Sequence, residues 1–532
     1  MRTRIFLAVQ LTFAAVFACP QATIAQDSSH TIGWPMRSHN VRRTGQALVV
    51  GPRKVGRVWS YKAVDGNVIN IEATAVPSGV FFGTWGIMRE HGSKRQRDKF
   101  DGKLFGLNRR TGRELWNPLH PGRTPYAYRY SGRQPTQQDK PAGPGLHLNW
   151  SNGTIEGTAA VDPKTGTLYV GRGDGTLFAV DPKRGRLLWR FHTLDPSRPK
   201  DPEGGGEIVG GPLVTSDGTI VCATFAAPHR PDPPKRIRHE TNAVYAVSRD
   251  GKLLWRYPGQ GTVEAVFSAP PALSPSGRRV YAVTGLPDKK FPCECFAIDL
   301  KSGRLAWKLK LGTIGGYDIA VGKTGVIYVA GSEIGPLGDR PAAFAIRDRG
   351  TTGEILWGPV SLDGFRPKTQ FAGGVALRET RSGVQDVFVS TSGLRNLNAD
   401  AGALHRLDPK TGKVTATWQP AKASPPCVSF LSDVSLDADG VIYVAVRGQF
   451  KTLIKKKTNG RMYCLRFQRG RFTVVWSHEV DGQIDWASPA IGPDGGLFFG
   501  SSAAPNALAQ IRAHPPAKDV PGLDPVFYGI HE

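Results

Sequence analysis

The residues best suited to do chemistry are acidic side chains that recur at one place in a repeated pattern. They are Glu72, Glu156, Glu264, Asp318 and Asp485, with Glu207 and Asp433 nearby. If a fold gathers such carboxylates, they repel one another unless a cation or a basic side chain lies among them. Hard carboxylate oxygens suit Ca²⁺, which makes Glu72, Glu156, Glu264 and Asp318 candidate metal ligands. The alternative is that each acid bonds local backbone N–H groups or pairs with an arginine.

Other side chains near these acids suggest what a ligand there would need. Trp486 follows Asp485 directly, and Trp486 or Trp150 could stack on a planar ligand, although either could equally be packing. Asp318 and Asp485 are the candidates for a general base. Whether these groups meet at all depends on the elements that carry them.

Those elements belong to a repeat that dominates the sequence. Each unit has an apolar strand, a turn of the type Asp-x-x-Thr-Gly, and a short strand that ends in Trp, as at Asp408, Thr411, Gly412 and Trp418. Eight of the twelve tryptophans occupy this last position: Trp59, Trp116, Trp189, Trp255, Trp307, Trp357, Trp418 and Trp476. Their spacing averages about 60 residues, which fits a four-stranded propeller blade and no helical repeat.

The eighth unit is split between the two ends of the chain. Residues 484–512 supply strands without a Trp ending, whereas residues 56–59 are a Trp ending without strands before it. We therefore predict an all-β, eight-bladed propeller of four-stranded antiparallel blades, closed by a strand at about residues 56–61 that completes the last blade and removes the sheet edges. The expected propeller spans residues 56–514, after a lead-in at 26–55 and before a C-terminal tail at 515–532.

The repeat resembles that of the pyrroloquinoline-quinone (PQQ) repeat propellers over residues 33–512. The segment from Gly33 to Asn40 also resembles the lead-in of exported members. The resemblance implies that the eight tryptophans dock neighbouring blades together. It implies no single activity, because the family contains quinone-dependent dehydrogenases, an outer-membrane assembly scaffold and many propellers without an assigned role.

Two function classes follow from the resemblance. In the first, the propeller is a non-catalytic binding or scaffold module. In the second, it is a PQQ- and Ca²⁺-dependent dehydrogenase of alcohols or sugars, with Glu72, Glu156, Glu264 and Trp486 around the cofactor. The adjacent-cysteine disulfide and the fused cytochrome of some dehydrogenases are both missing from the sequence. A hydrolase or lyase is a weaker third option, since no Ser–His or Cys–His pair can be placed in register.

Turn lengths separate the two faces of the expected disc. The first-to-second and third-to-fourth turns of each blade are short, so the long connections should share the opposite face, where function usually resides. Those connections carry basic and aromatic clusters: Lys94, Arg95, Arg97, Tyr126, Tyr128, Tyr130, Arg236, Arg238, Lys455, Lys456 and Lys457. We expect this rim to bind an envelope protein, an anionic glycan or a lipid headgroup, unless these are simply solvated loops. No recognition helix or base-stacking module points to nucleic acid.

Composition and the first residues of the chain indicate the kind of partner, the location of the protein and the state of its cysteines. The 532 residues carry a net charge of +25, which favours polyanionic partners. Residues 1–25 are typical of a secretory signal peptide, with lipidation at Cys19 as an alternative, so we expect an exported, periplasmic or extracellular protein without a transmembrane segment. Five cysteines remain after cleavage, namely Cys222, Cys293, Cys295, Cys427 and Cys464, so at least one has no partner within the chain.

Overall fold

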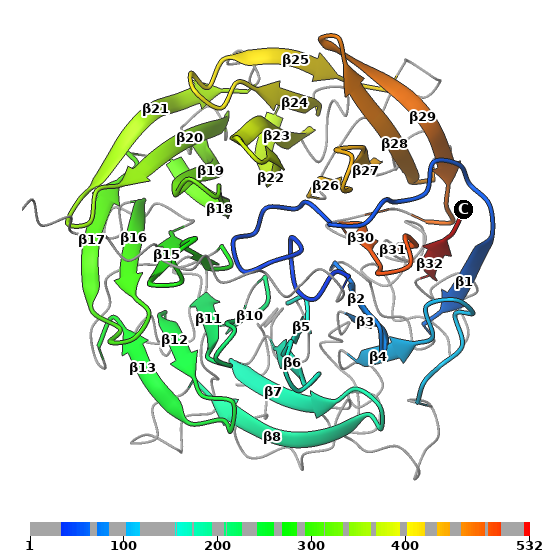
Figure 1. Cartoon of the computed structure of the whole chain (residues 1–532), viewed down its shortest axis with the longest axis horizontal. Helices are drawn as coiled ribbons and strands as arrows, with labels where there is room; N and C mark the ends of the chain where they lie inside the picture. The colour runs from blue at the N-terminus through cyan, green and yellow to red at the C-terminus, as the bar shows by residue number, and fades with distance from the viewer. Residues whose placement is uncertain are drawn as a thin grey trace, which may run out of the picture.

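Eight antiparallel sheets surround a central channel in the computed structural model of the chain (Figure 1). The structure describes residues 33–63, 72–84, 103–116, 155, 157–172, 175–193, 207–208, 210–225, 242–259, 269–284, 293–312, 314–333, 340–362, 369–393, 402–420, 433–446, 459–482, 484, 488–501 and 526–532. Within these ranges all regular structure is strand, which confirms the predicted all-β, eight-bladed propeller.

The blades are numbered in chain order, and the strands of each blade are named from the innermost strand outward. Blade 1 contains β2 (Thr74–Val76), β3 (Gly79–Gly83) and β4 (Leu104–Leu107), and a bridge between Leu107 and Glu114 marks its fourth position. Blade 2 contains β5 (Ala160–Val161), β6 (Leu168–Gly171), β7 (Thr176–Asp181) and β8 (Arg186–His192). Blade 3 contains β10 (Leu213–Val214), β11 (Ile220–Phe225), β12 (Val244–Val247) and β13 (Leu253–Tyr257), with β9 (Glu207–Ile208) also paired to β11. Blade 4 contains β14 (Ala272–Leu273), β15 (Arg279–Val283), β16 (Glu294–Asp299) and β17 (Leu305–Lys310).

The second half of the ring repeats this order. Blade 5 contains β18 (Ile314–Val321), β19 (Val326–Glu333), β20 (Arg340–Asp348) and β21 (Gly353–Ser361). Blade 6 contains β22 (Thr369–Thr380), β23 (Gly383–Gly393), β24 (Leu404–Leu407) and β25 (Val414–Trp418). Blade 7 contains β26 (Ser435–Leu436), β27 (Ile442–Val446), β28 (Arg461–Gln468) and β29 (Arg471–Glu479). Blade 8 contains β30 (Ala490–Ile491), β31 (Leu497–Gly500), β32 (Val526–Ile530) and β1 (Val58–Lys62).

Ring closure joins the two ends of the chain. Strand β1 lies outermost in blade 8 and pairs antiparallel with β32, with Trp59 opposite Gly529. This confirms closure by the N-terminal strand, but it corrects the expected boundary at residue 514. The third strand of blade 8 is β32, which the sequence analysis placed in a C-terminal tail. A single five-residue strand separated from β31 by residues 501–525 carries no periodic signal of its own.

The repeated tryptophans bind each blade to the next. The indole Nε1 of Trp59 donates to the Arg109 carbonyl in the third-to-fourth turn of blade 1 at 2.9 Å. Four equivalent bonds of 2.7–3.0 Å to backbone carbonyls follow around the ring, from Trp116, Trp189, Trp255 and Trp357. Trp307 instead donates to the side-chain Oδ1 of Asp348 at 2.8 Å. Blade 8 has no third-to-fourth turn because its outer strand comes from the other end of the chain. Trp476 of blade 7 therefore donates to the Pro52 carbonyl instead, at 2.8 Å.

The same contact explains the Thr-Gly turn of the repeat. Gly412 has φ +72°, and a Cβ at this position would lie 2.5 Å from the Trp357 ring of the preceding blade. Glycine is therefore required twice, once for the left-handed backbone and once for the space that the indole fills. The apolar cores follow the same plan. The cluster around Tyr281 and Ile319, for example, joins blades 4 and 5 rather than filling the channel.

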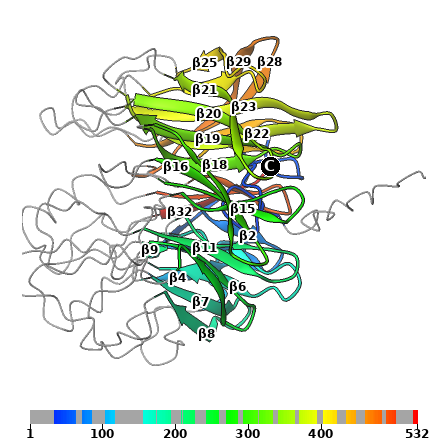
Figure 2. The same cartoon turned by 90° about the vertical axis from the view of Figure 1, so that its left-hand side faces the viewer.

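The blades also define two faces of the disc. Because the four strands of a blade run antiparallel in sequence order, the first-to-second and third-to-fourth turns share one face, here called the short-turn face. The tip of the β22–β23 hairpin projects on this side in Figure 2. The described part of the chain contains no helix of the length and hydropathy that a membrane crossing requires.

A pair of glycine substitutions tests the blade contact. Gly166 and Gly412 both have left-handed backbones, with φ +74° and +72°, but nothing lies within 4 Å of a Cβ at Gly166. We expect Gly166→Ala to cost about 1–2 kcal/mol from backbone strain alone. Gly412→Ala should cost about 1–3 kcal/mol more, because the Trp357 ring must move. Urea unfolding of both variants measures the difference, and equal losses would contradict the role given to this contact.

Candidate functional site: a channel filled by the lead-in segment

The channel is occupied on its short-turn face by residues 33–52, called the lead-in segment, which is drawn in blue at the centre of Figure 1. Its carbonyl groups accept hydrogen bonds from backbone N–H groups at the ends of the innermost strands. At blade 1 the Ala75 N–H donates to the Trp34 carbonyl at 2.9 Å, and the Trp34 N–H donates in return to the Ala75 carbonyl at 2.7 Å. Five more blades donate at 2.7–2.8 Å, through Val161, Leu273, Val321, Leu377 and Leu436. The segment contacts these blades in chain order, so it follows the inside of the ring.

Arg43 connects the lead-in segment to blades 3 and 4. Its side chain is fully buried, and its guanidinium donates to the carbonyls of Gly211 at 3.2 Å, Pro212 at 3.3 Å and Pro271 at 3.1 Å. Burial, and then the positive charge of Arg37, lower the pKa of Arg43 to about 10. The group remains charged at neutral pH, and the carbonyl oxygens around it compensate that charge.

Arg37 lies among three carboxylates from distant parts of the chain. Its Nη2 forms an ion pair with Asp433 Oδ2 at 2.9 Å. Burial alone would lower the pKa of Arg37, but the charges of Asp433, Asp318 and Glu72 outweigh it and raise the pKa above its ordinary value. Gly374 of β22 makes room for the Asp433 carboxylate, because a Cβ there would overlap it. The basic side chain that the acidic cluster requires is therefore supplied by the lead-in segment.

Glu72 precedes β2 and is held entirely by the lead-in segment. Trp34 Nε1 donates to Glu72 Oε1, and the Ser38 N–H donates to Glu72 Oε2 at 2.9 Å. The residue is 3% exposed, and burial followed by repulsion from Asp433 raises its pKa to about 8. Both carboxylate oxygens are already engaged, so Glu72 has little capacity to act as a calcium ligand.

Asp318 in β18 is the carboxylate that is least satisfied. Its Oδ2 accepts the Val375 N–H at 2.8 Å, whereas its Oδ1 is buried without a hydrogen-bonding partner. Burial, and then repulsion from Asp433, raise the pKa of Asp318 to about 7. A group that titrates near neutrality and has one free oxygen is the feature here that most resembles a reactive carboxylate.

The turn that delivers Arg37 and Arg43 is locally strained. Ser38, His39 and Arg43 have φ of 51°, 72° and 59°, and these are three of the four non-glycine residues with positive φ among those described. Such backbones cost free energy and persist only where surrounding contacts impose them. The hydrogen bonds to Glu72 and to the blade carbonyls provide that constraint.

The structure brings together part of the predicted site. Glu72, Asp318 and the neighbouring Asp433 meet around Arg37, and their environment matches the alternative in which acids bond backbone N–H groups or pair with arginines. The remaining candidates lie outside the described residues: Lys94, Arg95, Arg97, Tyr126, Tyr128, Tyr130, Glu156, Arg236, Arg238, Glu264, Lys455, Lys456, Lys457, Asp485 and Trp486. Within the described ranges, no three His, Cys, Asp or Glu side chains are arranged to hold a metal ion.

Sequence reasoning missed Arg37 and Arg43, although it singled out the segment that contains Arg37. The repulsion argument required a basic partner for the acids, but no spacing rule linked residue 37 to residues 318 and 433. The four described cysteines, Cys222, Cys293, Cys295 and Cys464, are buried free thiols. Residues 1–32 and Cys427 lie outside the described part, so the signal peptide and the possible lipidation at Cys19 stay predictions.

Comparisons with known proteins agree with this fold. A model of the family described as outer membrane protein assembly factor BamB matches residues 101–316. Quinohemoprotein alcohol dehydrogenase ADH IIB of Pseudomonas putida is 26% identical over 168 residues, covering 26% of this chain and 24% of that protein. Tetrathionate hydrolase of Acidithiobacillus ferrooxidans is 24% identical over 216 residues, covering 38% of this chain and 37% of that protein. The match thus spans well under half of either relative.

A solved structure extends the likeness to nearly the whole chain. The quinohemoprotein alcohol dehydrogenase of Comamonas testosteroni superposes with a TM-score of 0.56 at 12% identity, covering 95% of this chain and 82% of that one. At this identity the likeness defines the fold alone. Together with the repeat, it defines the fold as an eight-bladed propeller. The repeat, and the family match over residues 101–316, support a PQQ-repeat β-propeller.

The pKa shifts give a test of the cluster. Asp318 and Glu72 have pKa values raised to about 7 and about 8, above the ordinary carboxyl values near 4. The folded protein therefore binds more protons than the unfolded chain across this range, so its stability should fall as pH rises from about 4 to about 8. Asp318→Asn should flatten this dependence and raise stability at pH 8, by an amount on the order of 1 kcal/mol or more.

Unfolding midpoints from pH 5 to 8 measure this effect. The matched control is the exposed Asp250→Asn, because a hydrogen bond from Ser248 lowers the pKa of Asp250. Loss of that charge should not stabilise the protein at pH 8. An unchanged pH profile in Asp318→Asn would show that Asp318 ionises normally in the folded protein.

Proposed function

We propose that the protein is an exported binding or scaffold module that holds an envelope protein or an anionic polymer. The proposed binding surface is the face opposite the short-turn face, to which the long connections are expected to belong. The observation that carries this proposal is the engagement of the channel acids by the chain itself. Glu72 has both oxygens bonded to the lead-in segment, and Asp433 is paired with Arg37 at 2.9 Å. The lead-in segment also covers the channel on the short-turn face, which leaves the opposite face for a partner.

Charge and architecture support the same proposal. The net charge of +25 favours anionic partners, and the long connections contain basic clusters such as Lys455, Lys456 and Lys457. The ring holds the strand ends that flank these connections in fixed positions, and a rigid scaffold of this kind is what loop-borne binding sites generally require. Export to the periplasm or beyond is part of the proposal and rests on the character of residues 1–25.

Charge reversal tests the binding face. Lys455→Glu, Lys456→Glu and Lys457→Glu together should weaken binding of polygalacturonate, an acidic polysaccharide, by about tenfold, because three favourable charge contacts become repulsive. The matched control reverses three exposed lysines on the short-turn face, namely Lys301, Lys410 and Lys413. Calorimetric titration at two salt concentrations measures both variants, with uncharged dextran as the ligand control. If both triple variants lost the same affinity for polygalacturonate, the effect would come from net charge alone, which would contradict a binding face.

A quinone-dependent dehydrogenase is the second candidate, favoured by one specific observation, the unpartnered Oδ1 of Asp318. The similarity to quinohemoprotein alcohol dehydrogenases points the same way. The described residues do not fit a calcium–quinone site well, however. Glu72 would have to release Trp34 and Ser38 before it could bind a metal, and Asp433 would have to release Arg37. We therefore derive no catalytic step through such a cofactor.

Cofactor uptake separates the two candidates. Titration of the mature protein with PQQ in the presence of Ca²⁺, followed by absorbance, should show no saturable uptake if the protein is a binding module. Uptake at one equivalent that is lost in Glu156→Ala or Asp485→Ala, but kept in the exposed control Asp250→Ala, would overturn the binding proposal. Reduction of an artificial dye with alcohols or sugars would then identify the substrate class.

A further inference from the structure

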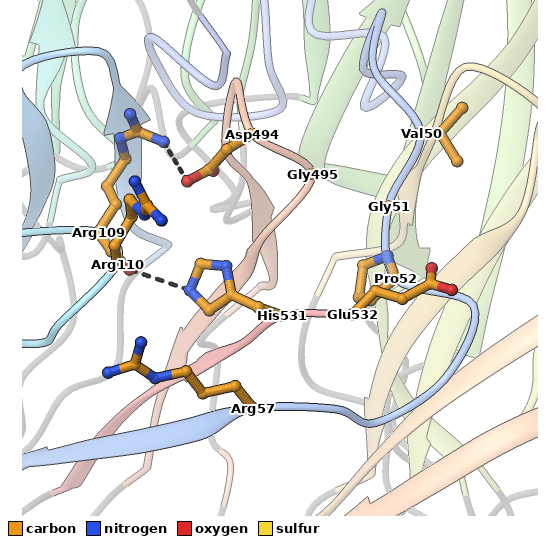
Figure 3. A pocket seen from close by; sticks show the side chains of 10 residues that line it. All are labelled: Val50, Gly51, Pro52, Arg57, Arg109, Arg110, Asp494, Gly495, His531 and Glu532. Carbon is orange, nitrogen blue, oxygen red and sulfur yellow. Dashed lines mark hydrogen bonds and ion pairs between the residues drawn. The ribbon is translucent and has the colours of Figure 1, made fainter.

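A cavity of about 570 Å³ lies at the seam where the ring closes (Figure 3). Its walls come from four separate places in the chain. These are residues 50–52 with Arg57 just before β1, Arg109 and Arg110 in the third-to-fourth turn of blade 1, Asp494 and Gly495 in the first-to-second turn of blade 8, and residues 531–532. Both turns belong to the short-turn face. The cavity therefore lies on the face opposite to the one proposed above for partner binding, and its size is typical of small-ligand sites.

Hydrogen bonds fix the inner wall of this seam cavity. Arg109 forms an ion pair with Asp494 at 2.6 Å. Its carbonyl accepts Trp59 Nε1 at 2.9 Å and His531 Nε2 at 3.0 Å. The turn of blade 1 is thus held against β1 and β32 without any ligand, so the cavity is preformed.

Two guanidinium groups in this cavity lack partners. Neither Arg57 nor Arg110 forms a side-chain hydrogen bond or an ion pair with any described residue, although both line the cavity. Figure 3 shows the Arg57 side chain extending toward the side where Arg109 and Arg110 lie. The Glu532 side chain lies across the cavity from them, and its Oε2 accepts the Arg53 N–H at 3.1 Å.

We propose that this seam cavity binds an oxyanion, a phosphate or carboxylate group, between Arg57 and Arg110. A guanidinium presents a planar set of N–H donors that matches the oxygens of either group, and charge-assisted bonds of this kind are the strong ones. The Arg109–Asp494 pair is internally neutral, so among the side chains that line the cavity the positive charges of Arg57 and Arg110 face the one negative charge of the Glu532 side chain. Because Arg57 precedes β1 of blade 8 and Arg110 belongs to blade 1, the anion also links the two blades at the seam.

Anion titrations of the full chain test the proposal. Inorganic phosphate and acetate are titrated separately by calorimetry, against chloride at constant ionic strength. We expect Arg57→Gln and Arg110→Gln each to weaken phosphate binding at least tenfold, and Arg57→Lys to lose less. Arg113→Gln is the matched control, since Arg113 is an exposed residue of the same turn that does not line the cavity. It should bind phosphate like the unaltered protein.

A second readout covers the linkage of the two blades. A ligand that binds only the closed ring stabilises it by mass action, so phosphate should raise the unfolding temperature of the unaltered protein and of Arg113→Gln, but not of Arg57→Gln. Binding of both anions supports a general oxyanion site, and binding of phosphate alone supports a phosphoryl ligand. Binding of acetate alone supports a carboxylate ligand. Absence of binding, or equal binding in Arg57→Gln and Arg113→Gln, overturns the proposal.

Discussion

The structure depends on how the inner edges of the innermost strands are satisfied. An eight-bladed propeller places eight strand edges around its central channel. A buried backbone N–H group at such an edge costs free energy unless it has a hydrogen-bond acceptor. Among the described residues, the lead-in segment provides such acceptors to six of the eight blades, from Trp34 at blade 1 to Gly45 at blade 7. One continuous stretch of chain therefore joins the innermost strands of these blades, covers the channel on one face, and carries Arg37 and Arg43 into the middle of the ring.

The lead-in region also replaces a missing part of the repeat. Most of the tryptophan contacts end on a backbone carbonyl in the third-to-fourth turn of the next blade. Blade 8 lacks that turn because β32 and β1 come from opposite ends of the chain. The Pro52 carbonyl accepts the Trp476 indole in its place. The chain just after Pro52 then reaches the seam cavity and β1. Ring closure, the filling of the channel and one wall of the seam cavity consequently all depend on one continuous segment, residues 33–62.

The sequence predicted the features that repeat and missed the features that occur once. Eight tryptophans at one position defined the blade count, and the isolated Trp59 ending indicated the closing strand, because each repeats a local contact. β32 was assigned to a tail, since five residues far from β31 have no periodic partner. The pairing of Arg37 with Asp433 joins positions 396 residues apart. Such a contact follows from ring closure and from the path of the lead-in segment, neither of which has a spacing signature.

The balance of charge in the channel connects these features to function. Three carboxylates face two arginines, and burial with mutual repulsion raises the pKa values of Glu72 and Asp318 into the neutral range. A proton held by this cluster would bring its net charge close to zero without any added cation. A divalent metal among the same acids would have to displace that proton and compete with Arg37, which gains its own compensation from Asp433. The charges of the described channel are thus balanced by its own residues, whereas Arg57 and Arg110 at the seam have no ion-pair partner among the described residues.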